Sequence, residues 1–189
     1  SQAGAAATPD MFRPVSDALP NYMEAEGRAN LVGPGAVAVP GNLAGWCAMQ
    51  AEHGVLPFAE VIAPAIRHAA DGFRITAYLT SNIERHAEDL AQDPGMAALF
   101  LPGGAPARPG HRLVQSAYAE SLRLVAQQGA GALHGGSLGQ ALVDFLGAAG
   151  HLTLDDLRGY TPREREAVFG SYRGFDIAGP PPPASSGVH

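Results

Sequence analysis

The sequence lacks lysine and holds little charge of either sign. Its 12 basic residues are all Arg, they stand against 18 acidic residues, and only 16% of the chain is charged. No run of like charge is longer than two residues, which excludes a basic stripe for nucleic acid or for an anionic membrane surface. Soluble domains usually carry about 25% charged residues. We therefore expect much of this chain to face other protein.

Cysteine and long apolar runs are also scarce. Cys47 is the only cysteine, so an internal disulfide is excluded. Its place in an apolar helical pattern predicts a buried thiol, because a free Cys usually behaves as a small hydrophobic residue. No apolar run approaches the roughly 20 residues that span a bilayer. The first residues, SQAGAAATPDMF, do not have the charged-then-apolar order of a signal peptide.

What the sequence does contain is a periodic apolar pattern between many chain breakers. A chain of 189 residues is about one domain long and can bury a core. The 24 Gly and 16 Pro residues indicate a folded but loop-rich chain. We predict an α+β fold, mostly α-helical, as one partial domain: an irregular lead-in over 1–41, a helical region over 42–159, and a hairpin with a Pro-rich segment over 160–189.

Glycine and proline residues divide the helical region into separate helices. Predicted helices span 42–52, 57–63, 64–71, 76–92, 96–100, 116–128, 137–149 and 153–158. We expect Gly54 to cap the first in the left-handed conformation. Pro64 should open a new helix at a kink, because proline suits a first helical turn.

Four polar side chains are placed to begin helices. Thr76, Ser116 and Ser137 each precede a periodic segment and are predicted N-caps. Thr153 and Asp156 have the spacing of a capping box, in which each side chain binds a backbone N–H near the other.

The last stretch alternates instead of following a helical period. Val168, Tyr172, Phe175 and Ile177 predict a β-hairpin. Two isolated strands are only marginally stable in water. We therefore expect the sheet partners outside residues 1–189, and the chain to be a fragment of a larger protein.

A formal G-x-S-x-G motif, typical of serine hydrolases, lies at residues 135–139. It would make Ser137 a nucleophile, with partners in the order acid then histidine. The possible partners are Asp155, Asp156 or Asp176, followed by His189. However, this motif requires a strand before it, and here a helix end and a turn precede Gly135. An N-cap role for Ser137 is the favoured interpretation, and the nucleophile is the alternative.

No cofactor is predicted. Seven His residues are spread along the chain with no pair at i, i+4, so the sequence offers no zinc motif. No Gly-rich loop follows a strand, which excludes the common nucleotide sites. Acidic pairs such as Glu88 with Asp89 are better explained as solvated helix faces or helix starts.

The final residues combine four prolines, Pro180 to Pro183, with a Ser-Ser-Gly run. A rigid extended segment followed by Ser185, Ser186 and Gly187 suits the start of a helix, where free N–H groups point outward. The alternative is a disordered tail.

Several segments, read in order, carry a resemblance. They are AATPDMF (6–12), VPGNLAG (39–45), LPFAEVIAPAIR (56–67), DGF (71–73), residues 100–115, LTLDDL (152–157), SYRGF (171–175) and PPPASSG (181–187). In this order they resemble the large subunit of the gamma-glutamyltranspeptidase family, along nearly the whole chain.

The resemblance implies an N-terminal-nucleophile hydrolase with an αββα core, made as a precursor that cuts itself in two. The N-terminal Thr of the small subunit would attack a γ-glutamyl amide, such as glutathione, and pass the acyl group to water or an amino acid. That Thr and the oxyanion groups would follow His189, and the arginine that binds the substrate carboxylate would precede Ser1.

The resemblance therefore implies no catalytic residue in this chain, with Ser185, Ser186 and Gly187 beside the substrate. The implied partners are the remainder of the large subunit, the small subunit and a small γ-glutamyl substrate, without nucleic acid or a membrane span. The resemblance implies a periplasmic or secreted bacterial protein. A cytoplasmic location is the alternative.

Two alternatives remain. The family resemblance extends to cephalosporin acylases and capsule-processing transpeptidases, and Gly4 stands where the family usually has Pro. A cephalosporin-acylase-like amidase is one alternative. The other is a non-catalytic, helix-rich interaction module that acts alone and uses its poorly charged surface to hold a permanent partner.

Overall fold

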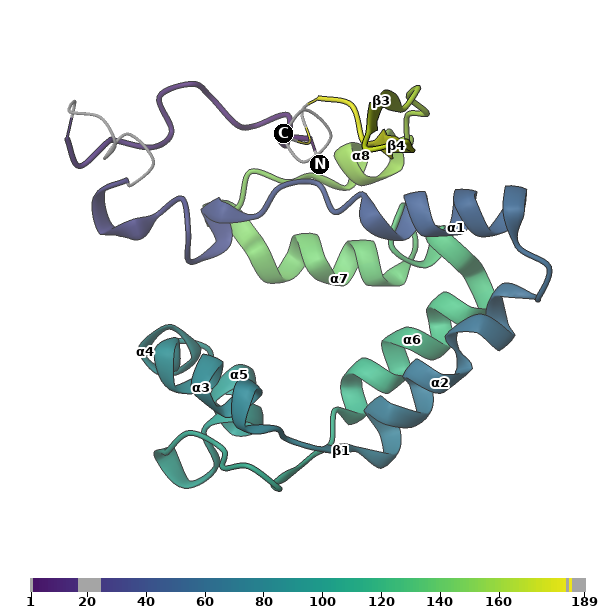
Figure 1. Ribbon diagram of the computed structural model, residues 1–189. Helices are drawn as coiled ribbons and strands as arrows, with labels where there is room; N and C mark the ends of the chain where they lie inside the picture. Colours follow the sequence, from purple (N-terminus) through teal and green to yellow (C-terminus); the bar gives the residue numbers. More distant parts are fainter. Residues whose placement is uncertain (1, 17–24, 183, 185–189) are drawn as a thin grey trace.

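The computed structural model describes residues 2–16, 25–182 and 184, and its helices form an open C (Figure 1). The helices are α1 (Asn42–His53), α2 (Phe58–Asp71), α3 (Ala77–Arg85), α4 (Ala87–Leu90), α5 (Pro94–Phe100), α6 (Ser116–Gln128), α7 (Ser137–Leu146) and α8 (Leu154–Arg158). Short 3-10 turns are η2 (Glu26–Arg28), η3 (Pro34–Ala36), η4 (Pro102–Gly104), η5 (Gly129–Ala132) and η6 (Gly147–Ala149). The strands are β1 (Phe73–Arg74), β2 (Arg112–Leu113), β3 (Val168–Tyr172) and β4 (Phe175–Gly179). The predicted class, α+β and mostly helical, is confirmed.

The side of the C is the pair α2 and α6, which lie against each other along their length (Figure 1). Small residues, Ala69 and Ala119, are buried between them beside Leu122, so the two backbones approach closely. The prediction of two short helices around Pro64 is wrong, because α2 continues through this proline. Pro64 removes one backbone hydrogen bond, and packing on α6 along both halves of α2 keeps them in one helix.

One end of the C is a lobe formed by residues 73–113. Helices α3, α4 and α5 surround a buried core of Ile75, Ile83, Leu101, Ala107 and Leu113. Strands β1 and β2 pair antiparallel at its base, with Phe73 opposite Leu113. These two-residue strands were not predicted.

The helix predicted over 76–92 begins as expected but is broken. The Thr76 hydroxyl accepts the Leu79 N–H at 3.2 Å, which confirms the N-cap. His86 then leaves helical geometry, with φ −112° and ψ 17°. The break starts α4 in a new direction and lets Ala87 and Leu90 pack on the lobe core. The next helix, α5, starts at Pro94 because Asp93 caps it by accepting the Met96 N–H at 2.7 Å.

The other end of the C is a layer of α1, α7, α8 and the lead-in. Val39, Leu146, Leu152 and Leu157 form its buried core. The lead-in joins this layer through buried Val39, and the Val39 N–H donates to the Gln2 carbonyl at 2.8 Å, which holds the first residues of the lead-in beside it.

Four expected helix ends or starts are wrong. Gly54 has φ −80° and is not left-handed, because the Gln50 side chain reaches past it to the Leu56 carbonyl and completes the turn. Ser116 and Ser137 are first helical residues, and the cap positions belong to Gln115 and Gly136. Helix α7 stops at Leu146, since Gly147 takes φ 55° and a 3-10 turn replaces the last predicted turn.

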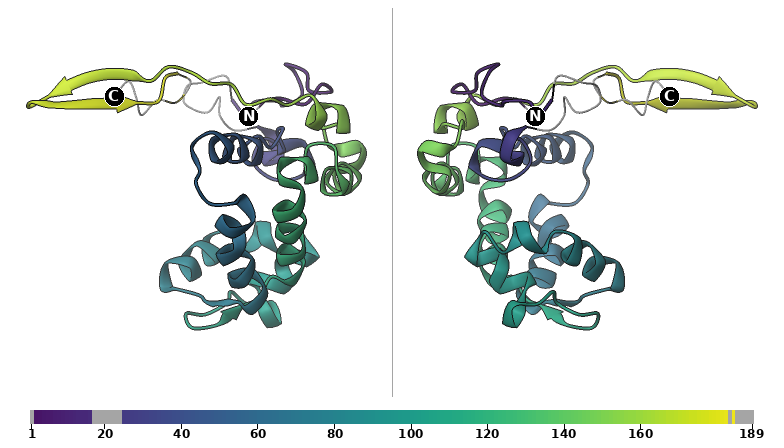
Figure 2. Two further views of the ribbon diagram at one scale, coloured as in Figure 1. Left: turned by 90° about the vertical axis from the view of Figure 1, so that its right-hand side faces the viewer. Right: turned by 90° about the vertical axis from the view of Figure 1, so that its left-hand side faces the viewer.

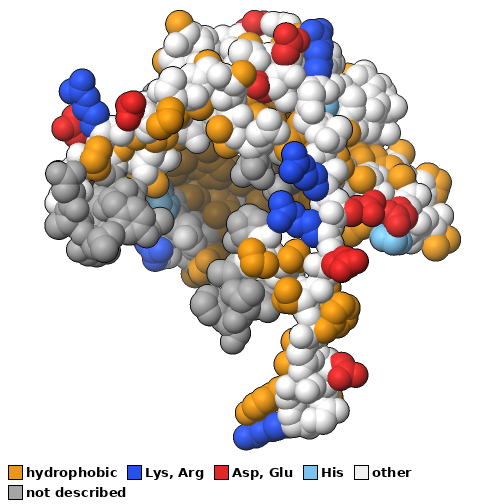
Figure 3. All heavy atoms as spheres, turned by 90° about the horizontal axis from the view of Figure 1, so that it is seen from above, with side chains coloured by type: hydrophobic (Ala, Val, Ile, Leu, Met, Phe, Trp, Pro, Cys, Tyr) orange, Lys and Arg blue, Asp and Glu red, His pale blue; other side chains and the backbone are white. Residues whose placement is uncertain are grey.

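The predicted β-hairpin and capping box are confirmed. Strands β3 and β4 pair antiparallel from Val168 opposite Gly179 to Tyr172 opposite Phe175. The hairpin projects away from the helices (Figure 2), and all but its first and last residues are exposed. Seen from above, it is the narrow projection at the bottom of Figure 3 and carries hydrophobic side chains. Among the described residues, no helix is long and apolar enough to cross a membrane.

Candidate functional site

Ser137 does not have the surroundings of a nucleophile. It is exposed at the first turn of α7, and the 3-10 turn η5 and a loop precede it where a hydrolase motif needs a strand. No hydrogen bond within the described part of the chain joins it to a histidine or a carboxylate. The N-cap interpretation is also wrong, because the Ser137 side chain caps nothing.

The acidic residues named with Ser137 have structural partners or lie elsewhere. Asp155 pairs with Arg158 at 3.3 Å on the surface of α8. Asp156 belongs to the capping box, and Asp176 lies on exposed β4. His189 falls outside the described residues. Over those residues the structure contains no group of three or more His, Cys, Asp or Glu that could hold a metal ion.

The Asp156 carboxylate is the most heavily bonded acid in this layer. One oxygen accepts the Thr153 hydroxyl at 2.7 Å and the Thr153 N–H at 2.8 Å. The other accepts the Ala5 N–H at 2.9 Å. The hydrogen bond from the Thr153 hydroxyl is the main reason that the pKa of Asp156 is lowered. Asp156 therefore caps α8 and also ties the lead-in to it.

Close backbone contact supports the same junction. A Cβ built on Gly4 would lie 1.8 Å from the His151 carbonyl oxygen, so only glycine fits there. A proline at this position, as expected from the family pattern, would require the two segments to move apart.

His134 makes a second contact with α8. Its Nδ1 lies 2.9 Å from the Leu157 carbonyl, which can only accept, so Nδ1 is the protonated nitrogen. Its ring stacks on Tyr160, with 5.5 Å between centroids. Its Nε2 is buried without a partner in the described structure. The ring links the loop before α7 to α8 and to Tyr160, which begins the chain that leads into the hairpin.

The Pro-rich segment is described as far as Pro182, with Ala184 beyond it. The Arg165 guanidinium donates to the Pro182 carbonyl at 2.8 Å, which holds the Pro-rich segment against the start of the hairpin. Ser185, Ser186 and Gly187 fall outside the described residues. The contact of Ala5 with Asp156 on α8 and the contact of Pro182 with Arg165 are the candidate framework of a site.

An ion pair joins the lead-in to the lobe. Arg28 donates to both oxygens of Asp89, at 2.7 and 2.9 Å, and this contact lowers the pKa of Asp89. It is a structural contact between segments 61 residues apart in the sequence.

An apolar groove of about 540 Å³ lies between α1, α2, α6 and the start of α7. Its lining contains no charged side chain and therefore no acid, base or anion-binding group. The prediction that Cys47, on α1, is buried is wrong, because its side chain is only partly covered. Partial burial nevertheless raises the pKa of the thiol, which favours the unreactive protonated form.

Sequence reasoning missed the link between Asp156 and Ala5, the role of His134 and the groove. The sequence offered the Thr153–Asp156 spacing, but no local signal pairs residues 151 positions apart.

Comparisons with known proteins place these features in a larger context. A family model described as gamma-glutamyltranspeptidase matches residues 1–189. The Acylase ACY 1 proenzyme of Pseudomonas sp. (strain V22) is 52% identical over 190 residues, which cover 100% of this chain and 34% of that protein. The glutathione hydrolase proenzyme of Escherichia coli (strain K12) is 31% identical, covering 99% and 32%.

A solved structure is similar as well. The gamma-glutamyltranspeptidase of Helicobacter pylori is 26% identical with a TM-score of 0.88, and the match covers 98% of this chain and 52% of that one. This chain spans about a third of the length of the curated relatives it matches.

Proposed function

Because the chain belongs to the gamma-glutamyltranspeptidase family, we propose that it is the helical lobe and hairpin of an enzyme that cleaves a γ-glutamyl amide, such as glutathione. The acyl group passes to water or to an amino acid. The observation that carries this proposal is the family match along the whole chain. The fold agrees with it: the mostly helical chain with its small hairpin is that of an N-terminal-nucleophile hydrolase.

The proposed nucleophile is an N-terminal Thr on the partner subunit. Its hydroxyl attacks the γ-glutamyl carbonyl, and its own α-amine accepts the hydroxyl proton. The acyl–oxygen bond forms, the amide C–N bond breaks, and the amine product leaves with that proton. Water or an amino acid then attacks the ester and frees the Thr.

The proposed role of this chain is to position one wall of that site. Ser185, Ser186 and Gly187 would lie beside the substrate, and Pro180–Pro182 would lead to them. The bond between Arg165 and Pro182 and the ties from Asp156 and His134 to the neighbouring segments support such a framework.

A second candidate differs only in the acyl group. The acylase relative is 52% identical, whereas the glutathione hydrolase of E. coli is 31% identical. The higher identity to the acylase is the observation that supports this second candidate, an N-acyl substrate without the γ-glutamyl α-amino group. The cleavage would follow the same steps, since both relatives match nearly the whole of this chain.

Two chromogenic substrates separate these candidates. γ-Glutamyl-p-nitroanilide and glutaryl-p-nitroanilide differ only by the α-amino group. The full polypeptide that contains this chain should release p-nitroaniline faster from the first, and the reverse order would establish the acylase candidate. The 189-residue chain alone should release none from either. Turnover by the pure chain would overturn the proposal of a nucleophile on another chain.

The third possibility, a non-catalytic module that acts alone, predicts a different mature polypeptide in the cell. Its mass would correspond to a chain that ends near His189. A product that continues to a Thr-led small subunit would exclude the module.

A further inference from the structure

Helix α1 has more apolar surface than this chain covers. Its sequence, NLAGWCAMQAEH, places apolar residues on every side, which is typical of a helix surrounded by protein. Yet Ala44 is its only buried residue. Trp46 and Met49 remain 58% and 59% exposed. Side chains this large are expected to be covered when the protein is complete.

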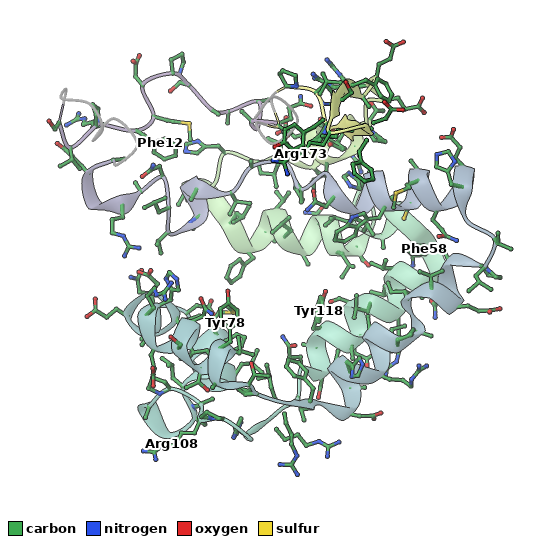
Figure 4. The ribbon with its side chains drawn as sticks, in the orientation of Figure 1. Phe12, Phe58, Tyr78, Arg108, Tyr118 and Arg173 are labelled. Atoms are coloured by element: carbon green, nitrogen blue, oxygen red, sulfur yellow. The ribbon has the colours of Figure 1, made fainter. Side chains whose placement is uncertain are left out.

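These exposed side chains line one wall of the apolar groove. Val61 from α2 and Tyr118 and Val125 from α6 line the opposite wall. Figure 4 shows Tyr118 pointing from α6 into the opening beneath α7, with Phe58 near the start of α2. Three helices therefore bound the groove of about 540 Å³.

Two polar side chains in the groove lining are already used within the chain. Gln50 donates to the Leu56 carbonyl at 2.6 Å, and the Ser121 hydroxyl donates to the Ala117 carbonyl at 3.1 Å. Small-molecule sites normally combine an apolar pocket with a few placed polar groups that orient the ligand. With both of these groups engaged and no charge in the lining, the groove fits an apolar helix face better than a polar small molecule.

We propose that this groove is the docking site for an amphipathic helix from the rest of the family-length polypeptide. The proposal rests on family membership and on the proposed function as part of a larger enzyme. The relatives are proenzymes about three times as long as this chain. Because the remaining segments are tethered to the groove, their effective concentration exceeds that of a second molecule in solution. This favours them over a second copy of the chain.

Cysteine reporters test whether the groove is covered. On a Cys47→Ser background, Met49→Cys and Val61→Cys place single thiols in the groove, and Glu84→Cys places one on an exposed face of α3. Each variant is made in the isolated chain and in a chimera, in which this chain replaces the matched residues of the strain V22 acylase proenzyme. Maleimide labelling is followed by peptide mass mapping, with circular dichroism to check folding.

Both groove thiols should be labelled at least tenfold more slowly in the chimera than in the isolated chain, while Glu84→Cys should react alike in both. Equal labelling rates would overturn the proposal. Protection in the isolated chain that grows with concentration would assign the groove to a second copy. Protection at every concentration would assign it to a bound apolar molecule. Either result also overturns the proposal.

A second measurement guards against a chimera that does not fold. The same reporters at the aligned positions of the unmodified acylase should be protected, and reactive thiols there would count against the proposal. Release of p-nitroaniline by the chimera is a separate result. A protected but inactive chimera supports the docking site and counts only against the proposed function. An active chimera with reactive groove thiols supports the proposed function and counts against the docking site.

Discussion

The lobe of residues 73–113 and the hairpin of β3 and β4 differ in how much of their apolar surface they bury by themselves. The lobe has a buried core, and its chain returns to its starting point through β1 and β2. The hairpin has ten paired residues, yet Phe169 is 80% and Phe175 74% exposed. A region closed by nearby contacts forms its own core. A two-stranded sheet cannot, because nothing in the described chain covers its faces.

The largest expected effect tests this difference directly. Ile83→Ala removes a side chain that is 3% exposed in the lobe core and should lower the free energy of unfolding by about 2–5 kcal/mol. Phe169→Ala should change it by less than about 0.5 kcal/mol, as for an exposed site. Guanidinium unfolding followed by circular dichroism measures both. A hairpin loss as large as the lobe loss would mean that the chain itself covers the hairpin.

A smaller effect is expected where α2 enters the lobe. Gly72 has φ 76° and ψ 162°, a region that is nearly restricted to glycine. A Cβ there would lie 2.7 Å from the Leu113 carbonyl oxygen. Gly72→Ala should therefore lower the free energy of unfolding by about 1–3 kcal/mol.

Gly45→Ala is the matched control for Gly72→Ala. Gly45 lies inside α1 with nothing within 4 Å of its built Cβ, so alanine should stabilise the helix by about 0.5–1 kcal/mol. Thermal unfolding of the two variants should shift in opposite directions. Shifts of the same sign would contradict the reason given for Gly72.

The smallest effect concerns the contact that ties the lead-in to α8. Asp156→Ala should lower the free energy of unfolding at neutral pH by about 0.5–1.5 kcal/mol, the usual net contribution of a hydrogen bond. Asp155→Ala should cost less, because its pair with Arg158 lies on the surface.

The cost of Asp156→Ala should also depend on pH. The folded-state pKa of Asp156 is lowered, chiefly by the Thr153 hydroxyl. The contribution of the carboxylate is therefore full above its unfolded pKa of about 3.9 and is lost as the pH falls through the folded pKa. Urea unfolding at pH 6 and at pH 3 should show a smaller difference from the wild type at pH 3. A difference that is equal or larger at pH 3 would contradict this assignment.

Local signals predicted much of the fold. The periodicity of 42–52 and 116–128, the cap at Thr76 and the box at Thr153 all depend on neighbours within four residues, and they are confirmed. The errors lie where distant packing overrides such signals. Packing on α6 keeps α2 continuous through Pro64, and packing of partly buried Leu90 on the lobe core accompanies the break at His86.

The candidate site was less predictable for the same reason. The family pattern named Ser185, Ser186 and Gly187, which lie outside the described residues. The contact from Ala5 to Asp156 and the groove beside Trp46 join segments far apart in the sequence. No spacing rule can detect such contacts from one chain.

The sequence by itself determined which segments are helices, that the chain ends in a hairpin, and which family it resembles, because these depend on local spacing and on motif order. Only the tertiary structure decided that the lobe closes on itself while α1 and the hairpin keep apolar surface exposed. Burial depends on which distant segments meet, and apolar surface that the described residues leave uncovered remains available to the rest of the protein.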